Sequence, residues 1–129
     1  MIVRMPFPDP ALSPNRTKGR HWTALSAAKA AAREAGYFAT KQAATEFSTP
    51  AGDIALSLLF LTPDKRRRDA DNLLAASKSM LDGMADALGV DDRRFRPILV
   101  DWQPGPPGGA LLVAVGVQIR SGMNLEVVA

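Results

Sequence analysis

The chain has 129 residues, 47% of them apolar and 22% charged, a balance that excludes a disordered protein. We expect one domain over residues 1–129, with no membrane span and no secretory leader. The absence of cysteine excludes disulfides and thiolate chemistry, and favours a cytoplasmic location. Because the net charge is only +3, any affinity for nucleic acid must come from local clusters of cations.

The first third of the chain predicts a strand, a loop and a helix. Residues 2–7 are apolar and end at prolines, as expected of a short strand. Residues 8–22 predict a surface loop, which is either a connector or a contact for substrate phosphates. Its cations are Arg16, Lys18 and Arg20. Residues 23–46 are rich in alanine and predict the first long helix.

The middle and the end of the chain predict two regions of sheet around a second helix. The apolar run 54–62 is typical of a central strand buried on both faces. Residues 72–88 predict a helix capped by Asp71 or Asn72 and closed by Gly89, with Asp71, Lys78 and Asp82 along one edge of its apolar face. Residues 95–103 and 110–120 predict two strands, which we expect to pair as an antiparallel hairpin. The fold class is therefore α/β (α+β) in the order β-α-β-α-β-β, a mixed sheet with two helices.

Two small groups of acids lie among the cations of residues 64–96. Four cations, Lys65 to Arg68, run into Asp69 and Asp71, and the pair Asp91-Asp92 is followed by further arginines. Carboxylates gather against their own repulsion mainly when a cation joins them, and hard divalent cations prefer oxygen ligands. Arginines beside such a site suggest that its third component is a phosphate.

The distance between the two acidic groups leaves open whether they share one site. A helix of seventeen residues spans roughly 25 Å at 1.5 Å per residue. The second pair can approach the first only if the chain after Gly89 folds back, or if a second subunit supplies it.

The same segment resembles the RusA-type Holliday junction resolvases. The residues that carry the resemblance are a basic run into Asp-x-Asp-Asn (Arg66 to Asn72), the helix lysine Lys78, the later pair Asp91-Asp92, and the opening MPFPDPALSPNR. The similarity spans essentially the whole chain and implies a RusA-like fold and a homodimer. It also implies that Asp69, Asp71 and Asp92 are catalytic carboxylates that bind Mg²⁺, with Mn²⁺ as an alternative and Asp91 as a further ligand.

Lys78 departs from the family pattern. In the best-known member the lysine comes one turn sooner after Asp-x-Asp, where this chain has Ala75 and Ala76. An offset of one turn keeps the same helix face. The resemblance therefore assigns Lys78 a catalytic role, as the cation that neutralises charge developing on the phosphate.

The activity implied by the resemblance is the resolution of four-way DNA junctions by paired, symmetric nicks, in recombination and repair. The DNA backbone would be held by Arg66, Arg67, Arg68, Arg93, Arg94, Arg16, Lys18 and Arg20. Two other interpretations remain open. One is a protein that binds branched DNA without cutting it, and the other is a cation-binding or partner-binding domain without enzymatic activity.

Overall fold

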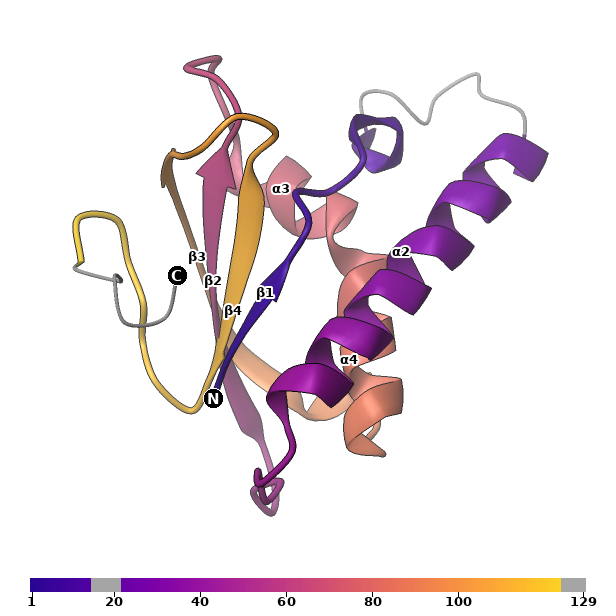
Figure 1. The fold of residues 1–129 in the computed structure, drawn as a ribbon, viewed down its shortest axis with the longest axis vertical. Coiled ribbons are helices and arrows are strands. Elements are labelled where there is room, and N and C mark those ends of the chain that lie inside the picture. Colours follow the sequence, from indigo (N-terminus) through magenta and orange to yellow (C-terminus); the bar gives the residue numbers. More distant parts are fainter. Residues whose placement is uncertain (15–21, 124–129) are drawn as a thin grey trace.

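The apolar run Ile54–Thr62 forms β2, one of the two inner strands of a four-stranded sheet in the computed structural model (Figure 1). The structure describes residues 1–14 and 22–123. The other strands are β1 (Ile2–Met5), β3 (Phe95–Pro104) and β4 (Ala110–Val115), and the strand order is β1-β4-β2-β3. β2 pairs antiparallel with β4 and parallel with β3, so the sheet is mixed.

Three α-helices of the described chain lie on one side of this sheet (Figure 1). They are α2 (Trp22–Ala43), α3 (Ala70–Ala76) and α4 (Lys78–Leu88), with the short 3₁₀ turns η1 (Pro10–Leu12) and η2 (Asp92–Arg94). Parallel strands cannot be joined by a tight turn, because the chain must return to the same end of the sheet. α3, α4 and η2 make that return between β2 and β3.

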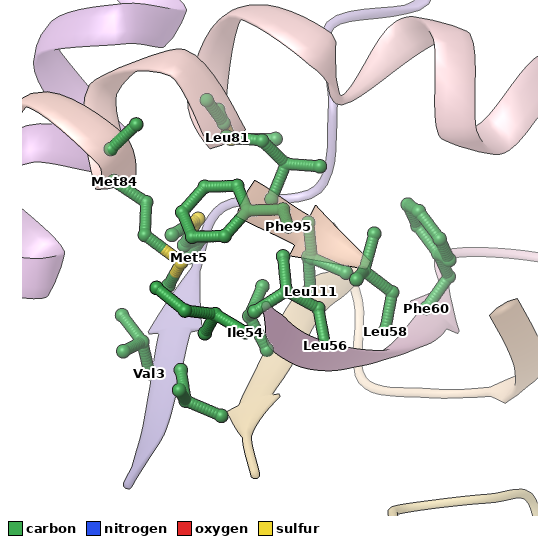
Figure 2. Close-up of a cluster of buried hydrophobic side chains, with 14 of the residues drawn as sticks. Val3, Met5, Ile54, Leu56, Leu58, Phe60, Leu81, Met84, Phe95 and Leu111 are labelled. Atoms are coloured by element: carbon green, nitrogen blue, oxygen red, sulfur yellow. The ribbon is translucent and has the colours of Figure 1, made fainter. Parts of the chain in front are cut away.

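The main core lies between the sheet and α4 (Figure 2). Leu58 and Phe60 of β2 belong to the same buried cluster as Leu81 and Met84 of α4, and Phe95 at the start of β3 is also part of it. The opposite face of the sheet has a smaller core, in which Ile119 packs on Leu59 and Leu112. Because both its faces are covered, β2 is buried except at Ala55, which confirms the prediction of a central strand.

α2 and α4 cross closely because a glycine lies on each side of the contact. A Cβ atom added to Gly36 would collide with the main chain of Met80, and one added to Gly83 would collide with the main chain of Arg33. Gly36 therefore has a packing role that its low helix propensity conceals. At the edge of the same contact, Arg33 Nε donates a 2.6 Å hydrogen bond to Asp86 Oδ2.

The structure corrects the prediction of one helix over residues 72–88. The helix is broken at Ser77, whose φ of −91° and ψ of −2° leave the regular helical range. The buried Ser77 hydroxyl donates a 2.8 Å hydrogen bond to the carbonyl of Leu74. A serine that bonds to its own backbone in this way competes with the helical ladder. The second helical segment is therefore two helices, α3 and α4.

The predicted hairpin of residues 95–103 and 110–120 is wrong. β3 and β4 do not pair, because β2 lies between them and bonds to both. β4 also ends at Val115, before Gly116, whose φ of 80° turns the chain away. Val117 is 54% exposed, so it does not share the buried face of Val113 and Val115.

The described residues form one mixed α/β domain, as the sequence predicts. No helix in residues 1–14 or 22–123 has the length and apolar character needed to cross a membrane.

We predict that Gly36→Ala destabilises the protein by roughly 2 kcal/mol, because the new methyl group forces apart two main chains that are in contact. Urea denaturation measures the change. Ser26→Ala, at an exposed position of the same helix, is the control and should stay within about 0.5 kcal/mol of the wild type. If Gly36→Ala raised stability, as helix propensity alone predicts, the close crossing would be refuted.

Candidate functional site

A cleft of about 310 Å³ opens between the returning helices and the start of β3. We call it the carboxylate cleft, because three aspartates line it. α3 contributes Asp71, α4 contributes Lys78 and Asp82, and η2 contributes Asp92. Apolar side chains complete it, namely Leu74, Ala75, Leu81, Phe95 and Ile98. The chain after Gly89 does fold back, so one chain brings Asp71 and Asp92 to the same cleft.

Lys78 joins two of these carboxylates. Its Nζ donates one hydrogen bond of 2.8 Å to Asp82 Oδ1 and another of 2.8 Å to Asp92 Oδ2. The hydrogen bond to Asp82, followed by that to Asp92, raises the pKa of Lys78 above its ordinary value, so the ammonium remains charged at neutral pH. The lysine thus connects α4 to η2 despite its position one turn beyond that expected from the resemblance.

Asp71 differs from the other two aspartates of the cleft. It is exposed in the first turn of α3, and its carboxylate forms no hydrogen bond or ion pair within residues 1–14 and 22–123. It is therefore available to a ligand without the loss of an existing contact.

Asp69 has a structural role and lies in another cleft. Its Oδ1 accepts hydrogen bonds of 2.8 Å from the N–H of Asp71 and 3.2 Å from that of Asn72. It is thus the N-cap of α3, a role that the sequence had suggested for Asp71 or Asn72. The structure does not place Asp69 with Asp71 and Asp92 in the carboxylate cleft.

The cleft that Asp69 lines has a volume of about 260 Å³, and we call it the arginine cleft. Its walls are the segment around Phe7 and η1, the start of α3, and three consecutive arginines, Arg66 to Arg68. Asp69 and Asn72 face this cleft, whereas Asp71 between them faces the other, so the first turn of α3 separates the two clefts.

Two of the three arginines are held by Asp64. Arg66 Nη2 and Arg68 Nη1 each lie 3.1 Å from an oxygen of that carboxylate. The backbone hydrogen bond from Arg66 and the guanidinium of Arg68 lower the pKa of Asp64 to about 2. Arg68 is only 14% exposed and also lies over the ring of Phe7. Arg67 is exposed and has no partner of this kind in the described chain.

The acidic pair after Gly89 is divided in the same way. Asp91 caps η2 and pairs with Arg93 at 2.9 Å, and that arginine lowers the pKa of Asp91 to about 2. Asp91 does not line the carboxylate cleft, whereas Asp92 does. Arg94 donates hydrogen bonds to the carbonyls of Pro50 and Gly52, so it anchors the chain before β2. The loop cations Arg16, Lys18 and Arg20 lie outside the described residues.

The donors of the carboxylate cleft fit a hard divalent cation in their chemistry. Three carboxylates and one ammonium give the cleft a formal charge of −2 at neutral pH, equal and opposite to that of Mg²⁺. In residues 1–14 and 22–123, no three acidic or histidine side chains converge closely enough to form a ready-made metal cage. Mg²⁺ commonly uses one or two carboxylates and retains water, which suits a cleft of this kind.

Asp82 is the residue that the candidate set omitted. The sequence placed it on the same helix edge as Lys78, and the spacing of four residues was the available signal. Such an ion pair on a helix surface usually contributes little to stability, so the sequence offered no strong reason to choose Asp82. Asp82 is recognised as part of the cleft only because Lys78 also bonds to Asp92 in the folded chain.

We predict that Asp64→Asn loosens the arginine cleft and lowers stability at neutral pH. A carboxylate whose pKa is depressed by folding adds stability above its unfolded pKa, here near 3.8, and this contribution disappears as the pH falls through about 2. The difference in the free energy of unfolding between wild type and variant should therefore be largest at pH 7 and should decrease between pH 4 and pH 2. Urea midpoints at several pH values measure it. A difference that is independent of pH would show that the Asp64 charge has no part in it.

Comparison with known proteins gives a relative but no function. No family model matches the chain. A protein of Xylella fastidiosa described as uncharacterized is 41% identical over 103 residues, which cover 77% of this chain. The matched region spans 66%, just under two thirds, of that relative's own length.

Proposed function

We propose that the protein is a Mg²⁺-dependent endodeoxyribonuclease that cuts branched DNA, with the four-way junction as its substrate. The observation that carries this proposal is the meeting of Asp71, Asp92 and Lys78, from three separate elements, along one cleft of a single chain. The resemblance of the central motif to the RusA-type resolvases supports the choice of reaction and substrate.

In this proposal Asp71 and Asp92 hold Mg²⁺, and Asp82 adds negative charge beside them. The bound ion would supply Lewis acidity at the scissile phosphate and lower the pKa of a water molecule. The Asp71 carboxylate has no partner in the described part of the chain, and Asp92 has one oxygen that Lys78 does not contact. Asp69 supports the metal site indirectly, since it caps α3, fixes the first turn of that helix and so sets the position of Asp71.

Lys78 provides the positive charge that the reaction needs. Hydrolysis of a phosphodiester forms a bond from water oxygen to phosphorus and breaks the bond to the leaving oxygen, so negative charge increases on the phosphate in the transition state. A fixed ammonium stabilises that charge without reorganisation. The buried side chains of Leu81 and Phe95 exclude water from one wall of the cleft, which strengthens the attraction.

Exposed cations of residues 65–67, together with Arg93 of η2, would hold the DNA backbone. Arg67 and Lys65 are exposed and have no internal partner in the described chain, so phosphates can bind them at no structural cost. Arg66 and Arg93 retain 70% and 88% side-chain exposure and can contribute while paired. Arg68 and Arg94 are engaged in the fold, and we assign them no direct contact with DNA.

A homodimer completes the proposal. A four-way junction has near two-fold symmetry, so two copies of the cleft related by a two-fold axis would nick two strands symmetrically. A junction-binding protein without nuclease activity is the second candidate. The position of Lys78 between Asp82 and Asp92 favours it, because its ammonium already hydrogen-bonds to two of the three carboxylates.

We predict that Asp71→Asn reduces cleavage of a synthetic four-way junction by about 100-fold or more and leaves junction binding within about twofold. The change removes a negative charge and one carboxylate oxygen from the metal site, and it breaks no contact within residues 1–14 and 22–123. Gel assays with Mg²⁺ or EDTA, beside a linear duplex of matching sequence, measure cutting and binding. Glu34→Gln, exposed on α2, is the control of equal charge change.

Paired nicks confined to the junction and dependent on Mg²⁺ would support the proposal. Tight binding by the wild type without any cut would favour the second candidate. Loss of folding in Asp71→Asn would instead assign that carboxylate a structural role.

We predict that Arg67→Ala weakens junction binding and reduces the slope of log K against log salt by about one, since one phosphate contact is lost. Arg94→Ala is the matched comparison. It should lower thermal stability, because it removes the hydrogen bonds to two carbonyls of the loop before β2, and leave the salt slope unchanged. The reverse pattern would move the DNA path from the arginine cleft to η2.

A further inference from the structure

We propose that Lys78 and the divalent cation compete for Asp92, and that Asp82 is the positioning residue that retains Lys78 in the carboxylate cleft when the cation binds. This inference rests on the proposed function for the presence of a cation. It assigns a role to Asp82, a carboxylate that the RusA-type motif does not include, and it describes an exchange at the site rather than a fixed arrangement.

The two hydrogen bonds of Lys78 are equal in length but differ in kind. Asp82 lies four residues further along the same helix, so this pair keeps its spacing whatever the rest of the chain does. Asp92 belongs to η2, on the far side of the turn after α4, and its side chain is more exposed than that of Asp82, at 42% against 25%. The contact with Asp92 is therefore the one that a ligand from solvent can replace.

Charge makes the exchange favourable. A divalent cation gains more from Asp92 than an ammonium does, because the attraction scales with the product of the charges. An ammonium released without a partner would be drawn into bulk water by its strong hydration. Asp82 prevents this loss, since it accepts a 2.8 Å hydrogen bond from Lys78 by itself. Lys78 then remains beside the phosphate, and the N–H that had bonded to Asp92 can donate to the substrate instead.

If Lys78 and the cation compete, two substitutions in this cleft should change the cation affinity in opposite directions. Lys78→Met removes the competitor and should raise cation affinity, whereas Asp82→Asn removes negative charge from the cleft and should lower it. If Lys78 were only a structural bridge from α4 to η2, both substitutions would lower the cation affinity, because either one would loosen Asp92.

The test is a calorimetric titration of the 129-residue protein with Mn²⁺ in the absence of DNA. We expect Lys78→Met to bind Mn²⁺ about tenfold more tightly than the wild type, and Asp82→Asn about three- to tenfold more weakly. Asp82→Glu should restore most of the affinity. Lys29→Met and Glu34→Gln, both exposed on α2, make the same charge changes away from the cleft and should leave the affinity within about twofold.

Junction cleavage by the same variants supplies the second readout. Lys78→Met should cut poorly despite its tighter cation binding, and Asp82→Asn should lose turnover that Asp82→Glu recovers at saturating Mn²⁺. Equal or weaker Mn²⁺ binding by Lys78→Met would overturn the competition while leaving the nuclease proposal intact. Absence of Mn²⁺ binding by the folded wild type, together with uncut junctions, would overturn both.

Discussion

The parallel pairing of β2 with β3 is the constraint on which the rest of the structure depends. It obliges the chain to travel back along the sheet between Thr62 and Phe95, and the amphipathic helices α3 and α4 do so while burying the main core. Their return path brings Lys78 and Asp82 alongside the residues that lead into β3. The carboxylate cleft thus results from this crossover connection, because it forms where α3 and α4 lie beside the start of β3.

Much of this fold could be predicted from local patterns, and the misses have physical causes. The run Ile54–Thr62 was identifiable because a strand covered on both faces needs apolar residues throughout. The pairing of β3 was not, since sequence neighbours usually pair and nothing in residues 95–120 shows that β2 will insert between them. The helix break at Ser77 was also hidden, because serine often occupies a helix interior without breaking it.

The candidate site shows a similar division. The acids at 71 and 92 and the lysine at 78 were identified, and the fold brings them to one cleft. The arginines were less predictable, because a charge count cannot separate a cation that is free from one held two residues away, as Arg66 is by Asp64 and Arg93 by Asp91. Asp69 and Asp71 also look equivalent in sequence, yet the first turn of α3 turns them to different clefts.

The edge strand β1 has a consequence for biosynthesis. Ile2 to Met5 pair only with β4, and the two strands lie at opposite ends of the described chain. During translation these apolar residues leave the ribosome long before residues 110–115 exist to receive them. Until then Val3 and Met5, fully buried in the finished protein, have no sheet to join. The N-terminal strand β1 therefore cannot join the sheet until β4, the last strand of the described chain, has been synthesised.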